Sequence, residues 1–369
     1  MDPGTPMTTA FVYTGGPFSD AGDQFAAEGV PAPLGFLPSP DVVSTVPENG
    51  DENPYGVAFV PRGFLSRGGP LEAGDILVSN FNNSSNLQGT GSTITRVPVS
   101  GTASTFFTTP DAVLGGTGTG LSTALGVLRA GFVVVGSVPS VTGSISTSGP
   151  GSLLVIDGKG ELKNTIIDPS INGPWDMALV DLGSEAVAFV SNVFAGNVVR
   201  LNFHVSASGL TLQKSTVIAT GYQHRGDGSA FAVGPTGLVY DPRADVLYVA
   251  STEDNAVYAV RDAIRTAGAT GTGDVIYADA THLHGPLGMA MAPNGDLMVA
   301  NSDVINSDPS QPSEIVEFTE KGEFVKELPV DPAQGGSFGL AVNVSGRVAT
   351  FAAVDDNTAS LLIWTLGVP

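Results

Sequence analysis

Three of the four histidines in the chain lie in two short segments whose spacing suits metal binding. His224 stands in one segment, and His282 and His284 stand two positions apart in the other. In extended backbone, side chains two positions apart point to the same side, so this pair can chelate Zn²⁺, Cu²⁺ or Fe²⁺. We expect His224, His282 and His284 to form a divalent transition-metal site. The competing interpretation is that each ring only caps backbone groups where a strand begins.

Two charged residues could act beside such a metal. Arg225 directly follows His224, and its guanidinium could bind a carboxylate or stabilise an oxyanion, or could instead pair with Asp227. Asp176 occupies a position at which similar stretches of the chain have glycine, and it could be a metal ligand or a general base. If the protein is an enzyme, these residues favour a metal-dependent lyase or hydrolase.

The elements that must position these residues are hairpins of one recurring kind. Residues 234–260 and 285–301 share a Gly-Pro entry, an apolar run, a tight turn and a second apolar run. The Asn-Gly turn at 294–295 is a strong hairpin signal, because both residues tolerate positive φ. The entry recurs at Gly56, Gly126, Asp176, Gly237, Gly288 and Gly339. A spacing of about 50 residues with three to four strands per unit predicts an all-β fold, a six-bladed β-propeller of four-stranded antiparallel blades.

The two ends of the chain predict how the ring closes. The last repeat offers only three strands, whereas residues 41–46 form a short β-like run that belongs to no repeat. We expect residues 41–46 to supply the outermost strand of the last blade, which leaves no open edge between blades. Residues 1–40 are rich in Gly and Pro and are expected to be an irregular arm, with residues 41–369 as a single propeller domain.

The repeats also resemble a known family. Residues 234–257 and 285–301 are similar to the NHL repeat, whose entry is P-x-G-(L/V)-A and whose second strand continues as (L/I)-Y-V-A-D-x-x-N. Where the family has Asp after the second strand, this chain has Asn80, Asn192, Ser251 and Asn301. The resemblance implies an NHL-type propeller related to exported bacterial proteins. It also brings an analogy with peptidylglycine lyases and with gluconolactonase-like and paraoxonase-like enzymes, which carry a metal in the channel, although their full motifs are absent here.

In a propeller, each connector between blades runs from an outer strand to the next innermost strand. The ends of these connectors therefore reach the mouth of the central channel, where we expect the histidines and Asp176. Inserted loops at 81–92, 139–151 and 302–313 should gather on one face of the ring, and such loops commonly carry binding. Asn80, Asn192 and Asn301 end equivalent strands, and we expect their amides to hydrogen-bond each blade's turn.

Charge and composition limit the partners. The net charge of −21 opposes binding to nucleic acid and to anionic membrane surfaces. No run of 18 apolar residues is present, so we expect no membrane insertion. The chain has no cysteine, which removes disulfides and thiolate ligands. We expect an extracytoplasmic protein, periplasmic or secreted, whose leader peptide has been removed.

Two functions remain open at this point. The first is binding of a small molecule or peptide-like ligand at the channel mouth, with metal-assisted lyase or lactonase-like hydrolase chemistry. The second is a non-catalytic scaffold whose inserted loops hold a protein or glycan partner, because their Ser, Asn and Thr side chains suit adaptable polar contacts. The concentration of histidine and arginine near one rim favours the first.

Overall fold

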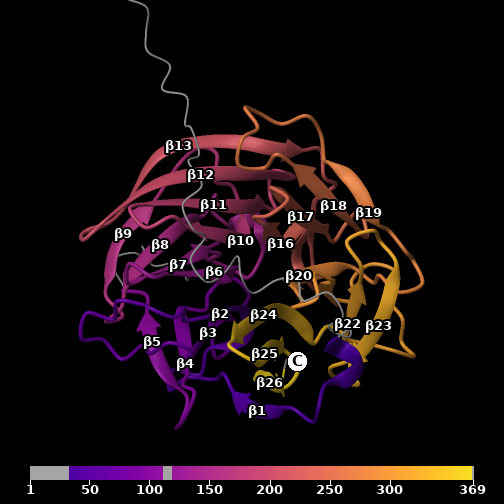
Figure 1. Ribbon diagram of the computed structural model, residues 1–369, viewed down its shortest axis with the longest axis horizontal. Coiled ribbons are helices and arrows are strands. Elements are labelled where there is room, and N and C mark those ends of the chain that lie inside the picture. Colours follow the sequence, from indigo (N-terminus) through magenta and orange to yellow (C-terminus); the bar gives the residue numbers. More distant parts are fainter. Residues whose placement is uncertain (1–32, 111–118, 368–369) are drawn as a thin grey trace, which may run out of the picture.

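The computed structural model describes residues 33–110 and 119–367, and Figure 1 shows a ring of β-sheets around a central axis. Six four-stranded antiparallel sheets, one for each blade, form the ring. The all-β class and the six-bladed architecture predicted from the repeats are therefore confirmed. Within these described ranges, no helix is both long and apolar enough to cross a membrane.

The first three blades follow one another along the chain, each from its inner to its outer strand. Blade 1 contains β2 (Glu52–Phe59), β3 (Ile76–Asn82), β4 (Thr93–Val97) and β5 (Ser104–Thr108). Blade 2 contains β6 (Leu121–Leu128), β7 (Phe132–Ser137), β8 (Ser152–Asp157) and β9 (Leu162–Ile166). Blade 3 contains β10 (Pro174–Asp181), β11 (Glu185–Asn192), β12 (Asn197–Ser206) and β13 (Gly209–Thr220).

The last three blades complete the ring. Blade 4 contains β16 (Pro235–Asp241), β17 (Val246–Ser251), β18 (Ala256–Arg261) and β19 (Asp274–Tyr277). Blade 5 contains β20 (Pro286–Met291), β21 (Leu297–Asn301), β22 (Glu314–Phe318) and β23 (Phe324–Pro329). Blade 6 contains β24 (Ser337–Ser345), β25 (Val348–Asp355), β26 (Ser360–Gly367) and β1 (Asp41–Ser44). Outside the blades lie the short 3-10 helices η1 (Pro33–Phe36) and η2 (Ile145–Thr147) and the two strands β14 (Arg225–Asp227) and β15 (Phe231–Val233).

The ring is closed by an N-terminal strand, as predicted from the two ends of the chain. Strand β1 pairs antiparallel with β26, from Asp41 opposite Ile363 to Ser44 opposite Ser360. The closing strand expected over 41–46 is thus confirmed for its first four residues. Of the arm expected over residues 1–40, residues 1–32 lie outside the described part of the chain.

Each inner strand carries a kink at the repeated entry. The pairing with the second strand shifts there, for example between Pro54 and Val57 and between Pro235 and Leu238. Glycine is needed because neighbouring inner strands touch: a Cβ on Gly237 would lie 2.0 Å from the carbonyl oxygen of Leu287. In blade 2 the shift runs from Leu121 to Leu125 and contains one more residue. The structural counterpart of the repeated glycine is therefore Ala124, and the assignment of Gly126 was wrong.

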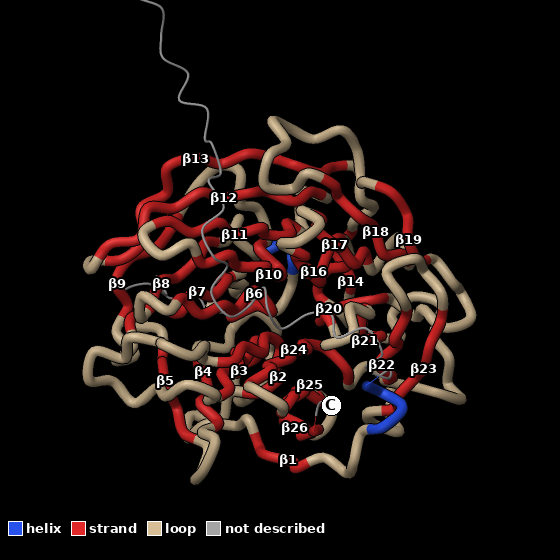
Figure 2. The backbone as a smooth tube through the Cα atoms, viewed as in Figure 1, coloured by secondary structure: helices blue, strands red, loops and turns tan. Residues whose placement is uncertain are grey.

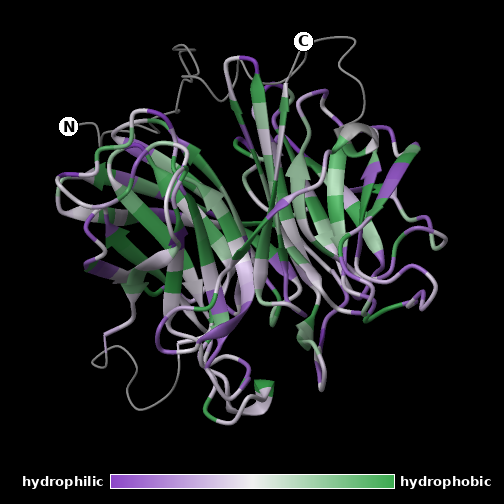
Figure 3. Cartoon of the chain, turned by 90° about the horizontal axis from the view of Figure 1, so that it is seen from below, coloured by the Kyte–Doolittle hydropathy of each residue, from purple (hydrophilic) through white to green (hydrophobic). Residues whose placement is uncertain are grey.

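The core consists of apolar layers between adjacent blades. Between blades 2 and 3, for example, Leu153 and Val155 pack with Val199 and Leu201, and none of the four is exposed. Figure 3 shows the hydrophobic residues mainly along the strands and the hydrophilic ones mainly in turns and loops. Buried hydroxyls tie neighbouring blades together by donating to inner-strand carbonyl oxygens, as Ser79 to Ser122, Ser122 to Pro174, Ser191 to Thr236 and Thr252 to Pro286.

One face of the ring carries the inserted loops. The start of β2 pairs with the end of β3, and β6 with β7 and β20 with β21 pair in the same way. The loops at 81–92, 139–151 and 302–313 therefore leave their blades at the edge where the inner strands begin. We call this edge of the ring the loop face. The prediction that the three inserted loops gather on one face is confirmed.

Candidate functional site

Aromatic rings close the centre of the loop face. Tyr55 from blade 1, Trp175 from blade 3 and Phe338 from blade 6 each come directly before the repeated entry position of their inner strand. Tyr55 stacks on Phe338 at 4.6 Å between ring centroids and lies 5.7 Å from Trp175. Phe81 and Phe231 complete the group, and we call these five residues the axial aromatic cluster. Because its members come from blades on different sides of the ring, the cluster crosses the central axis.

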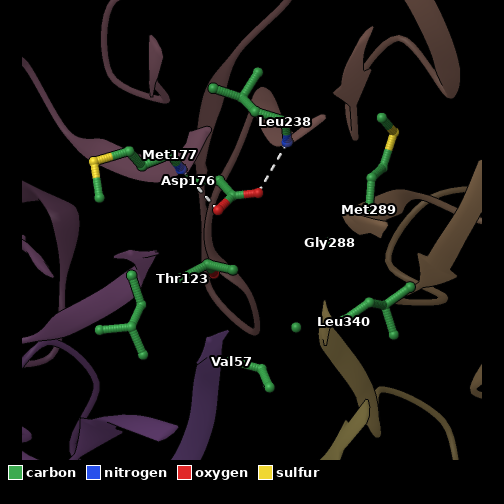
Figure 4. A pocket seen from close by; sticks show the side chains of 10 residues that line it. Val57, Thr123, Asp176, Met177, Leu238, Gly288, Met289 and Leu340 are labelled. Carbon is green, nitrogen blue, oxygen red and sulfur yellow. Dashed lines mark hydrogen bonds between the residues drawn. The ribbon is translucent and has the colours of Figure 1, made fainter. Parts of the chain in front are cut away.

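A cavity of about 140 Å³ lies on the axis next to this cluster, at the level of the following residues of the inner strands. Its lining comes from all six blades: Val57, Thr123, Leu125, Asp176, Met177, Leu238, Gly288, Met289, Gly339 and Leu340. Figure 4 shows the Asp176 carboxyl group facing this space, with apolar side chains around it. Thr123 provides the other polar side chain among these residues.

The position of Asp176 is fixed by bonds within blade 3 and across to blade 4. Its carboxyl oxygens accept hydrogen bonds from the backbone N–H of Met177 at 2.7 Å and of Leu238 at 2.9 Å. Its own N–H donates to the Ser191 hydroxyl at 2.9 Å, which in turn donates to Thr236 of blade 4. The carboxyl group thus spans the seam between two blades at a position where four of the other blades have glycine.

Burial decides the protonation of Asp176. Its side chain is only 8% exposed, and loss of water around the carboxylate raises its pKa from 3.8 to about 7, although the two N–H bonds act in the opposite direction. No basic side chain is among the residues that line the cavity. A carboxyl group of this kind is divided between its two protonation states near neutral pH. It can therefore give or take a proton within the cavity.

The structure does not bring the three histidines together as a metal site. The Nδ1 atom of His224 lies 3.1 Å from the carbonyl oxygen of Tyr222 in its own connector. The Nδ1 atom of His282 bonds to Asp279, and its ring stacks on Phe324 at 3.8 Å. In the described part of the chain, no group of three or more His, Cys, Asp or Glu side chains is arranged to hold a metal ion. This geometry therefore gives no support to the predicted Zn²⁺, Cu²⁺ or Fe²⁺ site of His224, His282 and His284, which stays a prediction.

His284 has a buried acidic neighbour that the sequence analysis missed. Its Nδ1 bonds to the Asn306 carbonyl oxygen, and its Nε2 lies 3.7 Å from Glu314. Glu314 is fully buried in β22, accepts a bond from the Asn301 amide at 2.7 Å, and has its pKa raised to about 7 by burial. The available signal was the run 314–318, in which Glu314 and Glu317 stand among three apolar residues of a predicted strand. This pair sits beneath the 302–313 loop and does not line the axial cavity.

Arg225, the remaining candidate, forms ion pairs with neighbouring acidic side chains at the surface. Arg225 pairs with Asp227 and, at 3.0 Å, with Glu253, and its side chain is 43% exposed, so it lies outside the axial cavity. The prediction that Arg225 assists catalysis therefore has no support in this geometry, whereas the alternative pairing with Asp227 is present.

Two of the three repeated amides, those of Asn301 and Asn192, behave as expected, whereas the Asn80 amide only donates, to the Thr45 carbonyl oxygen and to the hydroxyls of Thr93 and Thr95. Asn301 accepts the backbone N–H of His284 and donates to the carbonyl oxygen of His282, which fastens the connector into blade 5. Asn192 accepts from Asn172 and donates to Ser170 in the connector into blade 3. The predicted hydrogen bonds between the amides and the turns are confirmed for Asn192 and Asn301.

Fold and cavity together define the class of this protein as a closed six-bladed β-propeller with an axial site. No protein-family model matches the chain, and no curated protein matches it. Solved structures do share its fold. A proposed oxidoreductase (glucose dehydrogenase) from Thermus thermophilus is 14% identical with a TM-score of 0.52, covering 89% of this chain and 100% of its own. A proposed gluconolactonase is also 14% identical with a TM-score of 0.53, covering 92% of this chain and 98% of its own. At this identity the likeness establishes the fold, and the NHL relationship stays a prediction.

Proposed function

We propose that the protein binds a small molecule in the axial cavity and that Asp176 exchanges a proton with it, as a hydrolase of small lactones or esters. The observation that carries this proposal is a buried carboxyl group, with a pKa near 7, facing a cavity on the propeller axis. Hydrolysis is the reaction chosen because the fold is shared with a proposed gluconolactonase. An NHL-type origin of the repeats is part of the same proposal and rests on blades 4 and 5.

The cavity sets the size and polarity of the ligand. An apolar cavity of about 150 Å³ holds one benzene molecule, so a cavity of about 140 Å³ suits a ligand of about six heavy atoms. The lining offers Thr123 and Asp176 as polar side chains, and its other side chains are apolar. A small aliphatic lactone satisfies both limits. A sugar lactone is larger than a cavity of this volume accommodates.

Asp176 can serve the reaction in both of its protonation states. As a carboxylate it removes a proton from a water molecule while the water oxygen forms a bond to the carbonyl carbon of the lactone. As the tetrahedral intermediate collapses, the ring C–O bond breaks and the carboxylic acid returns the proton to the departing alkoxide oxygen. The product is a hydroxy acid, and Asp176 is again ionised. Since the first step needs the carboxylate, the rate is expected to rise with pH through about 7.

The test is hydrolysis of γ-butyrolactone, δ-valerolactone and simple acetate esters by the wild type and by Asp176→Asn. We expect the substitution to lower kcat/KM by about 100-fold or more, the usual range for loss of a general base. Glu317→Gln is the matched control, because Glu317 is also buried with a pKa near 7 but does not line the cavity. Hydrolysis that persists in Asp176→Asn, or a wild type that hydrolyses none of these compounds, overturns the proposal.

A further inference from the structure

A short hairpin in the connector from blade 3 to blade 4 stands outside the six blades. Strands β14 and β15 pair only with each other, with Arg225 opposite Val233 and Asp227 opposite Phe231. The Asp227 carboxyl group accepts bonds from the backbone N–H of Ser229 and Ala230 and so holds the turn. In the projection of Figure 2, β14 is drawn in the part of the ring that holds blades 4 and 5. We call residues 225–233 the connector hairpin.

The connector hairpin places one ring into the axial aromatic cluster. Phe231 is 1% exposed and lies 5.3 Å from Phe81, 6.1 Å from Trp175 and 6.2 Å from Phe194, measured between ring centroids. Its backbone has φ of +62°, a conformation that bulky residues rarely adopt. The backbone therefore accepts strain in order to direct this ring inward.

The polar contacts of the connector hairpin with its surroundings are few and lie at the surface, whereas its apolar residues Phe231, Ala232 and Val233 are buried. The Gln88 side chain donates to the carbonyl oxygen of Ser229 at 2.7 Å, and Arg225 pairs with Glu253 at 3.0 Å. Both contacts are exposed to solvent, where such bonds contribute little stability. Gly226 packs on Ile145 of the 139–151 loop. The hairpin shares no backbone ladder with any of the six blades.

We propose that the connector hairpin is a lid. When it swings away from the loop face, it withdraws Phe231 from the axial aromatic cluster and opens a path past Trp175 to Asp176, the next residue in the chain. A ligand arriving from the loop face has to pass this cluster, so opening of the lid controls its entry. The inference rests on the proposed function of the axial cavity as a binding site, but the lid motion can be measured without any substrate.

A reversible covalent lock tests the lid. The chain has no native cysteine. A Cβ on Gly226 would lie 3.7 Å from the Cβ of Ile145, which is within the range of a disulfide. The paired substitution Ile145→Cys and Gly226→Cys should therefore fasten the hairpin to the 139–151 loop when oxidised and free it when reduced. Ile145→Cys alone, treated with the same oxidant and reductant, is the matched control.

Trp175 supplies the readout. The chain has two tryptophans, so Trp364→Phe leaves Trp175 as the only one. We expect the constant for dynamic quenching of Trp175 fluorescence by acrylamide to fall several-fold on oxidation of the Cys pair and to recover on reduction. Phe231→Ala should raise it several-fold above that of the parent. Equal quenching in the oxidised and reduced forms overturns the lid.

The same variants separate the lid from the proposed function. If both hold, oxidation of the Cys pair also suppresses lactone hydrolysis, and reduction restores it. If quenching responds to the lock but no lactone or ester is hydrolysed, the lid stands and the hydrolase proposal fails. If hydrolysis depends on Asp176 but the quenching constant is the same with the Cys pair oxidised and reduced, the hydrolase proposal holds and the lid proposal fails.

Discussion

Replacing Asp176 by Asn should remove a defined part of the pH dependence of stability. The pKa of this carboxyl group is about 7 in the folded protein, against an ordinary value of 3.8. Between these two values the group is ionised in the unfolded chain and protonated in the folded one. The unfolded state then binds fewer protons, so the free energy of unfolding falls as pH rises. The stabilisation relative to the ionised state is fully present below pH 3.8 and is lost by the time the pH exceeds about 7.

The magnitude follows from the interval between the two pKa values. Each pKa unit corresponds to about 1.4 kcal/mol, so the passage from 3.8 to about 7 lowers the free energy of unfolding by about 4 kcal/mol. Between pH 5 and pH 6 the slope from this single group is about 1.4 kcal/mol per pH unit. Asn cannot ionise, so the variant lacks this slope. Glu314, Glu317 and Asp356 have similarly raised pKa values and supply further slope of the same sign.

Urea unfolding at pH 5 and at pH 6 measures this difference directly. We expect the free energy of unfolding of Asp176→Asn to fall less than that of the wild type, by about 1.4 kcal/mol over this interval. Asp274→Asn is the control, because Asp274 is 69% exposed and forms only a surface pair with Arg261. A variant with the same slope as the wild type would show that Asp176 is already ionised in the folded protein. In that case the argument from burial, and with it the proton exchange proposed for the axial site, is refuted.

Two further predictions concern ring closure and metal. Removal of residues 1–46 deletes β1 and exposes the edge of β26, so we expect a lower Tm and faster amide exchange in β26; unchanged exchange in β26 would contradict its role in closure. Because the histidines do not converge, His284→Ala and His224→Ala should leave the zinc content after dialysis against zinc the same as in the wild type. Loss of one equivalent of zinc in either variant would restore the histidine site.

The fold could be predicted because its signal is local and repeated. A Gly-Pro entry followed by two apolar runs around a turn specifies a hairpin, and six such units leave a propeller as the natural closed arrangement. The error in blade 2 arose because a repeat marked only by glycine does not reveal an extra residue in the kink. That extra residue moves the structural position to Ala124, and Gly126 is two residues further along.

The site was harder to predict, because it depends on which side chains cross the axis. The two histidine segments do reach the loop face, but His224 and His284 find backbone partners within it, and nothing in their spacing distinguishes such bonds from metal binding. A signal for the axial aromatic cluster was present in the sequence. Tyr55, Trp175 and Phe338 occupy the same place in three repeats, directly before the entry position. Phe231 gave no comparable signal, because its role depends on a hairpin that recurs in none of the other connectors as far as residues 33–110 and 119–367 describe them.

The other five blades show which residues the fold accepts at the position of Asp176. Gly56, Gly237, Gly288 and Gly339 occupy the same position in four other blades, and Ala124 occupies it in blade 2, so the fold forms there without a carboxyl group. At neutral pH, the buried carboxyl group lowers stability by about 4 kcal/mol relative to an acid that stays protonated. One of its two hydrogen bonds, from the Leu238 N–H, joins blades 3 and 4, but buried hydroxyl groups also bridge other pairs of blades without an ionisable group. The fold does not need a carboxyl group at this position, and the group lowers stability. Residues that lower stability without a structural role are typical of functional sites, and this one faces a cavity. We therefore expect the ligand to bind in the axial cavity.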